Sequence, residues 1–93
     1  MTEVGELCVI AVVSNARGLH ARAAARFVKL ADTFSAELTV TKDDMRVSAR
    51  SIMGLMMLAS TQGSTVHICG QGIDAAAALE ALTDLVKRKF DEE

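Results

Sequence analysis

A single histidine, His20, stands between a glycine-containing loop and a run of strong helix formers that begins at Ala21. Unpaired backbone N–H groups and the positive end of the helix dipole meet at a helix N-terminus, so this position can bind a phosphate or another anion. The same field disfavours imidazolium, and neutral imidazole is the nucleophilic form. Arg22 carries a guanidinium that could hold an anion on His20 bidentately. We therefore expect a histidine that accepts a negatively charged group, with phosphoryl as the candidate.

Taken alone, a histidine at a helix start is more often a plain cap or a surface residue, so the elements around it matter. The helix that must position His20 is predicted over residues 21 to 31 or 32. Gly18 interrupts the preceding strand pattern and can adopt positive φ. Apolar residues of this segment recur at the spacing of a helix with one buried face: Ala24, Phe27, Val28, Ala31 and Phe34.

The remaining periodicities predict a small α+β domain. Strands are expected over residues 6–13, 36–41, 45–49 and 65–69, with a short helix over 51–58 and a last helix after a turn at 70–72. The order β-α-β-β-α-β-α predicts an open-faced β-sandwich, in which three helices cover one face of a four-stranded, mostly antiparallel sheet. We expect residues 1–93 to form one domain.

The last helix is predicted to begin at an Asp74 cap and to end in a turn rich in cations, which complement the helix dipole. Its cationic residues are Lys87, Arg88 and Lys89. Its apolar stripe is Leu79, Leu82, Leu85, Val86 and Phe90.

Composition excludes several functional classes. With 51% hydrophobic residues, the 93-residue chain can build a core without a metal or a disulfide. A net charge of −2 and only three aromatic residues argue against nucleic-acid binding. No apolar run could span a membrane, and no signal peptide is evident. Cys8 and Cys69 lie in separate strand patterns without metal-ligand spacing, so we expect free thiols in a reducing cytoplasm.

Positive charge is concentrated in two stretches that contain no acidic residue, between Glu6 and Asp32 and between Asp44 and Asp74. The basic residues there are Arg17, Arg22, Arg26, Lys29, Arg46 and Arg50. They are either solvated faces or a docking surface for anions or an acidic protein.

The predicted helix at 51–58 carries more bulky apolar residues than one buried face can hold. Leu55 and Leu58 are the core candidates. Four other bulky residues remain: Ile52, Met53, Met56 and Met57. Some of them should be exposed, as an adaptable surface for protein docking, unless neighbouring elements cover the helix on all sides. Ser51 is a favourable N-cap and, alternatively, a phosphorylation site.

Three segments in this order and spacing resemble HPr, the histidine-containing phosphocarrier family of the bacterial phosphoenolpyruvate-dependent phosphotransferase system. They are Gly18-Leu19-His20-Ala21-Arg22, Ser51-Ile52-Met53-Gly54-Leu55-Met56 and Gln62-Gly63-Ser64. The resemblance covers nearly the whole chain and implies the same open-faced sandwich.

The resemblance implies that His20 takes a phosphoryl group on Nδ1 from enzyme I and passes it to a IIA component, with Arg22 beside the phosphoryl. It also implies that an HPr kinase/phosphorylase could modify Ser51, and that the apolar segment contributes to partner docking. We assign Arg17, Ile52, Met53 and Met56 to docking. We expect a monomeric, cytoplasmic, stoichiometric carrier, not a turnover enzyme, without cofactor, metal, membrane or nucleic-acid partner.

One departure from the family pattern is Ala23, where proline is usual. Proline near a helix start acts mainly on conformation, so the chemistry should stand, but sugar uptake and nitrogen-related regulation both remain open.

Two other functions also remain. One is a regulatory module that docks partners through the Met-rich helix; the other is a small-ligand or metal-binding ferredoxin-like domain, for which His67 would be a ligand.

Overall fold

The computed structural model describes residues 5–58 and 60–92. Its elements follow the predicted order: β1 (Leu7–Val12), α1 (Ala21–Ala31), β2 (Glu37–Lys42), β3 (Met45–Ser48), α2 (Ile52–Met57), β4 (Thr65–Gln71), α3 (Ala75–Lys87) and a short turn, η1 (Lys89–Asp91). The sheet order is β1-β4-β2-β3, and every neighbouring pair is antiparallel. The predicted fold class is therefore confirmed.

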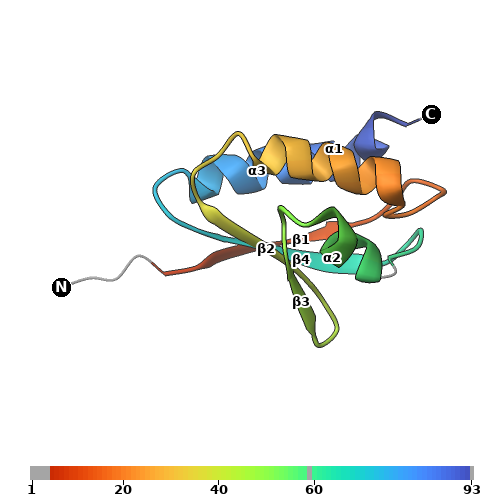
Figure 1. Ribbon diagram of the computed structural model, residues 1–93, viewed down its shortest axis with the longest axis horizontal. Coiled ribbons are helices and arrows are strands. Elements are labelled where there is room, and N and C mark those ends of the chain that lie inside the picture. The colour runs from red at the N-terminus through yellow and green to blue at the C-terminus, as the bar shows by residue number, and fades with distance from the viewer. Residues whose placement is uncertain (1–4, 59, 93) are drawn as a thin grey trace.

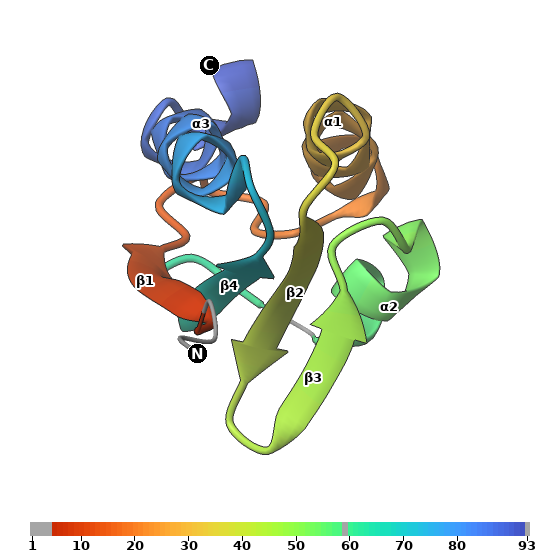
Figure 2. The same cartoon turned by 90° about the vertical axis from the view of Figure 1, so that its left-hand side faces the viewer.

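The helices form one layer over the sheet. Helices α1 and α3 pack side by side across one face (Figure 1), whereas α2 packs against α1 and β3 at the β3 edge of the sheet (Figure 2). Alternation along β2 turns Leu38 and Val40 into the core beneath these helices. On α1, the alanines at 23, 24 and 31 are fully buried, and these small side chains allow close packing of the helix.

The C-terminal segment departs from the predicted helix. Phe90 is buried, as its place on the apolar stripe suggests, but α3 ends at Lys87. Lys89, Phe90 and Asp91 have φ values of 58°, 55° and 62°, the left-handed region. Phe90 thus reaches the core through a left-handed turn, and the chain after it returns toward the start of α1.

The turn before α3 also differs from the prediction. Strand β4 continues through Gly70 to Gln71, which pairs with Glu37, so the turn starts at Gly72 and runs to Asp74. Asp74 occupies the N-cap position of α3 as predicted, but its carboxylate makes no cap bond within that helix. It instead accepts hydrogen bonds of 2.8 Å from the backbone N–H groups of Ser35 and Ala36, and so ties α3 to the loop before β2.

This arrangement predicts a pH-dependent contribution to stability. The pKa of the Asp74 carboxyl lies below its ordinary value of 3.8, mainly because the backbone of Ser35 donates a hydrogen bond to it. Hydrogen bonds from the backbone of Ala36 and Asp74 and the charge of Arg50 lower this pKa further, whereas desolvation raises it. A lowered folded-state pKa stabilises the fold above pH 3.8, and this stabilisation is lost as pH falls through the folded value. The difference in unfolding free energy between wild type and Asp74→Asn should therefore shrink below pH 3.8 in urea titrations. A difference that stays constant down to pH 2 would contradict this role.

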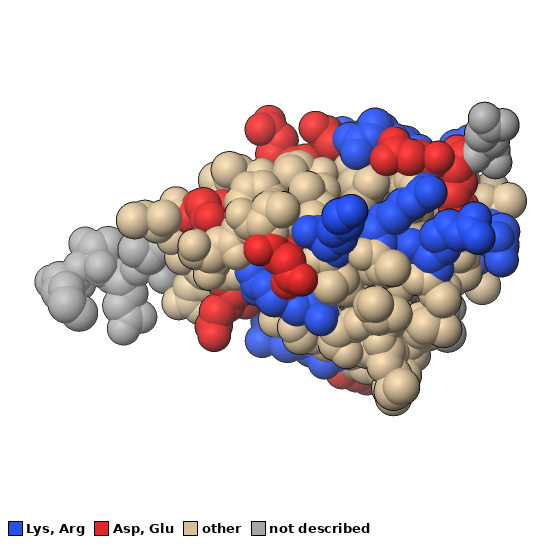
Figure 3. Space-filling view, turned by 45° about the horizontal axis from the view of Figure 1, so that its top comes forward, with Lys and Arg blue, Asp and Glu red and all other residues tan. Residues whose placement is uncertain are grey.

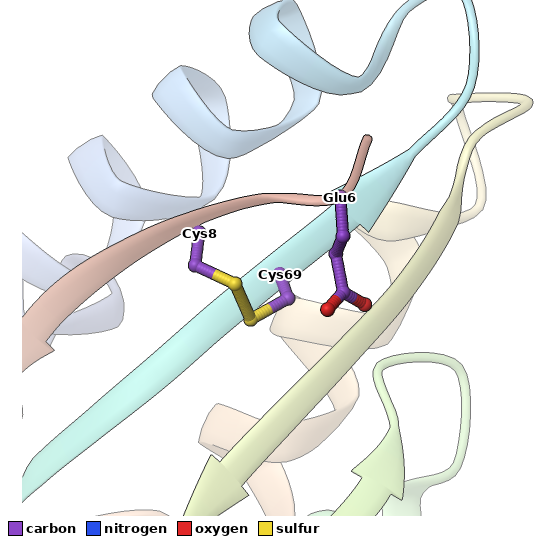
Figure 4. A group of neighbouring side chains, drawn as sticks. All are labelled: Glu6, Cys8 and Cys69. Carbon is purple, nitrogen blue, oxygen red and sulfur yellow. A yellow bond between two sulfur atoms is a disulfide. The ribbon is translucent and has the colours of Figure 1, made fainter. Parts of the chain in front are cut away.

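The sequence led us to expect two free thiols, but the two cysteines are bonded to each other. Cys8 of β1 and Cys69 of β4 are direct partners in the antiparallel register, with Cα atoms 4.0 Å apart, and they form a disulfide (Figure 4). The alternation within each strand places both residues on the face away from the helices. The pairing depends on the β1–β4 register, which no local pattern reveals.

Two of the basic residues have structural partners. Arg50 donates to the carbonyl oxygens of Ala31, Phe34 and Ala36, at 3.0, 2.5 and 3.0 Å. It thus provides hydrogen-bond donors for the last carbonyl of α1 and for the loop that follows the helix. Arg46 pairs with Glu6 across the sheet at 3.1 Å. The second basic stretch is therefore engaged within the fold, which argues against its alternative interpretation as a docking surface.

Candidate functional site

His20 occupies the N-cap of α1, the position its sequence context predicts. Its backbone is extended, with φ −78° and ψ 177°, and its carbonyl accepts the first helical bond from Ala24 at 2.8 Å. The backbone N–H of Arg22 points to Nδ1 of the imidazole at 3.3 Å. Nδ1 therefore faces the unpaired N–H groups of the first helical turn, where an anion is favoured.

Gly18 shapes the loop that presents this histidine. It has a φ of 67°, as expected, and a Cβ at this position would lie 2.2 Å from the carbonyl oxygen of Ser60. Leu19 donates to that same oxygen at 2.9 Å. The loop is thus pressed against the segment before β4, which only glycine permits.

Sequence reasoning missed the second partner of the histidine. The carboxylate of Glu92, which follows the left-handed turn, contacts Nε2 of His20. The same carboxylate accepts a 2.9 Å hydrogen bond from the Asn15 amide, which also donates to the carbonyl of Gly18 at 2.7 Å. The only local signal was the cationic run at 87–89, which marks a helix end and thus a change of direction before Glu92.

Glu92 is held in its charged form. Partial burial raises the pKa of its carboxyl, but hydrogen bonds from Asn15 and His20, together with the electrostatic attraction of His20 and Arg17, outweigh burial and bring it below the ordinary value of 4.5. The side chains of His20 and Glu92 are 15% and 16% exposed, so the pair stays within reach of another molecule at the surface.

An arginine hollow of about 280 Å³ lies beside this pair. Its lining residues are Ala16, Arg17, Arg22, Arg26, Asp91 and Glu92. In Figure 3, Lys and Arg side chains (blue) gather over the centre and right of the visible face, with Asp and Glu side chains (red) among them. Guanidinium groups at the mouth of a helix N-terminus suit a phosphoryl group in both charge and geometry.

Helix α2 presents the second predicted site. The Ser51 hydroxyl caps it by accepting from the N–H of Gly54 at 2.9 Å. Leu55 and Leu58 are buried, whereas the remaining bulky residues are 41% to 73% exposed. These are Ile52, Met53, Met56 and Met57, which line one shallow hollow and are called the Met-rich surface below. The expected division of this helix into core and exposed residues is confirmed.

One trio of side chains within residues 5–58 and 60–92 has metal-ligating atoms within 4.8 Å of one another: Glu6, Cys8 and Cys69. Figure 4 shows the Glu6 carboxylate beside the disulfide. The two sulfurs are bonded to each other, so they are not thiolate ligands in this state. His67, the metal ligand considered from the sequence, lies exposed on β4 and is not part of this trio. Within the same described ranges, no helix is long and apolar enough to cross a membrane.

A protein-family model described as "PTS HPr component phosphorylation site" matches residues 9–88. The chain belongs to the HPr family of phosphocarrier proteins of the phosphotransferase system. Phosphocarrier protein HPr of Neisseria meningitidis serogroup A is 48% identical over 80 residues, which cover 86% of this chain and 90% of that protein. The crystal structure of HPr-C-His from Thermoanaerobacter tengcongensis superposes with a TM-score of 0.89 at 45% identity, covering 94% and 98% of the two chains.

The branch of the HPr family is left open by these relatives. Phosphocarrier protein NPr of Shewanella violacea is 46% identical over 80 residues, which cover 86% of this chain and 88% of that protein. HPr and NPr proteins are thus similar to this chain to nearly the same degree. The Ala23 departure leaves the branch open as well; the side chain is fully buried in the first turn of α1.

Proposed function

We propose that this HPr-family protein accepts a phosphoryl group on His20 from phosphorylated enzyme I and passes it to a IIA component. The observation that carries the proposal is the placement of Nδ1 of His20 at the N-terminus of α1, beside the arginine hollow. A neutral imidazole nitrogen there meets both the backbone N–H groups and the guanidinium groups that a phosphoryl group requires.

In the transfer step, the Nδ1 lone pair attacks the phosphorus of the donor's phosphohistidine in line. The Nδ1–P bond forms while the donor's N–P bond breaks, and its electron pair returns to the donor imidazole. Arg22 and the N–H groups of the first turn stabilise the oxyanions during this exchange. The reverse step on an acceptor protein restores His20, so the protein is a stoichiometric carrier and not a turnover enzyme.

Docking is assigned to the Met-rich surface together with Arg17 at the rim of the arginine hollow. Helix α2 packs against α1, whose first residues follow His20, so the apolar and the reactive surfaces belong to adjoining helices. Flexible methionine side chains can adapt to partners of different shape, and Arg17 complements an acidic rim. We propose that a monomer in the cytoplasm meets enzyme I, IIA components and, where present, an HPr kinase/phosphorylase in this way.

Uptake of one phosphoryl group tests the proposal. The protein is incubated with enzyme I and phosphoenolpyruvate, and its intact mass is measured before and after brief acid treatment. We expect the mass of one phosphoryl group, lost in acid because an N–P bond to imidazole is labile, and ring NMR should place it on Nδ1. A protein that gains no phosphoryl group, or gains an acid-stable one, would contradict the role of His20.

The exposure of the Met-rich surface also favours a second function, a regulatory module that docks a partner through α2. A carrier should bind its partners differently before and after phosphorylation, whereas a docking module should be indifferent to the state of His20. A binding titration of the phosphorylated and unphosphorylated protein against the same partner separates the two.

Ser51 yields a further prediction, since its hydroxyl caps α2 beside the Met-rich surface. We expect a Ser51→Asp variant to accept phosphoryl from enzyme I more slowly, by roughly threefold or more, because a charge is added at the docking helix. Ser51→Asn is the matched control, since asparagine caps a helix as well as aspartate but carries no charge. Equal rates for both variants in single-turnover transfer would reduce Ser51 to a cap.

A further inference from the structure

We infer that Glu92 is a positioning residue for His20: its carboxylate selects the imidazole tautomer that carries the proton on Nε2 and leaves Nδ1 as the nucleophile. The inference deepens the proposed function and depends on it for its catalytic meaning, because it concerns the same histidine. The tautomer itself can be measured without any partner protein.

The contacts of the two ring nitrogens are of opposite kinds. The backbone N–H of Arg22 can only donate, so Nδ1 must offer a lone pair to it. The ionised carboxylate of Glu92 can only accept, so Nε2 must carry a proton. Only the neutral Nε2–H tautomer satisfies both contacts, since imidazolium would direct a second N–H at the Arg22 amide.

Glu92 is itself held in place by a buried amide. Asn15 is 1% exposed, and its side chain donates both to Glu92 at 2.9 Å and to the carbonyl of Gly18 at 2.7 Å. Because Gly18 lies two residues before His20, one amide connects the carboxylate to the loop that presents the histidine. The distance between Glu92 and His20 is thus set by the fold and not by a flexible surface contact.

The backbone before Glu92 supports the same interpretation. Three successive non-glycine residues at 89–91 adopt positive φ, a conformation that is unfavourable for residues with a Cβ atom. The turn is retained because Phe90 is buried and its carbonyl accepts a hydrogen bond from Arg26 at 2.5 Å. An ordinary continuation of α3 would carry Glu92 away from α1, so the left-handed turn is what delivers the carboxylate to the site.

The carboxylate also suits the chemistry of transfer. When Nδ1 attacks phosphorus, the ring gains positive charge, which a carboxylate on Nε2–H stabilises. No proton has to leave His20, because Nδ1 carries none in this tautomer. The Nε2–H bond to Glu92 can persist in the phosphohistidine, and the electron pair of the broken N–P bond stays with the donor.

The test measures the ¹⁵N ring resonances of His20 in the whole protein, at a pH where the ring is neutral. In the wild type we expect a protonated Nε2 and an unprotonated Nδ1. In Glu92→Ala, a mixture of both tautomers should appear, and phosphoryl uptake from enzyme I should slow on the order of tenfold, as loss of a charge-assisted hydrogen bond would cause. Glu80→Ala is the matched control, because it removes an exposed carboxylate of α3 that lies outside the arginine hollow.

Glu92→Gln separates the hydrogen bond from the charge. Its amide oxygen can still accept from Nε2–H, so this variant should keep the wild-type tautomer while remaining slower in transfer. An unchanged tautomer in Glu92→Ala, or an equal mixture in the wild type, would overturn the inference. If the wild type shows the expected tautomer but takes no phosphoryl group, the proposed function fails and the role of Glu92 in fixing the ring remains.

Discussion

A His20→Ala variant is expected to take up no phosphoryl group from phosphorylated enzyme I, a loss of at least a thousandfold relative to wild type. Alanine has no nucleophile, and no other side chain at the N-terminus of α1 can replace the ring nitrogen. Transfer of labelled phosphate from phosphoenolpyruvate, followed by gel separation, measures the effect directly.

Two companion variants make this result specific. His20→Asn should keep the helix cap, because asparagine is among the best N-cap residues, and should still take up no label. His67→Ala removes the other histidine, which lies exposed on β4 away from the helices, and should leave uptake unchanged. Label retained in both His20 variants would show that the acceptor lies elsewhere in the chain.

The second large effect concerns the disulfide between Cys8 and Cys69. It links residues 61 positions apart, and a loop of that size restricts the unfolded chain by about 4 kcal/mol on an entropic estimate. Cys8→Ser should therefore lower the unfolding free energy by about 2–4 kcal/mol and the melting temperature by on the order of 10–20 °C. Cys8 is the better site for substitution because it is exposed, whereas Cys69 is buried.

Urea denaturation with and without a thiol reductant measures this contribution. Reductant should destabilise the wild type by the same amount as the substitution and should leave Cys8→Ser unaffected. A wild type that is equally stable in both conditions would mean that the disulfide does not form in solution, and the original expectation of two free thiols would then stand.

Much of the fold could be predicted because it depends on local periodicity. The stripe that includes Phe27 placed α1, alternation placed Leu38 and Val40 in the core, and Ser51 marked the start of α2. These features arise from residues within about two turns or one strand of each other. His20 was likewise found at its cap because the loop and the helix adjoin in sequence.

Most of the features that were missed join distant parts of the chain. The Cys8–Cys69 bond depends on strand register, Arg50 is occupied by carbonyls at the end of α1, and Glu92 meets His20 across 72 residues. Each partner looks ordinary in its own neighbourhood, so no period or motif singles it out. The end of α3 was misplaced because the apolar spacing continues to Phe90, although the backbone has already turned left-handed.

The left-handed turn after α3 has a practical consequence for the design of protein samples. It brings Glu92 to His20, while the first residues of β1 lie toward the opposite end of the molecule (Figure 1). An affinity tag fused directly after the residues of this turn would add polypeptide beside His20, the proposed phosphoryl acceptor. Kinetic and NMR samples should therefore have such a tag removed before measurement.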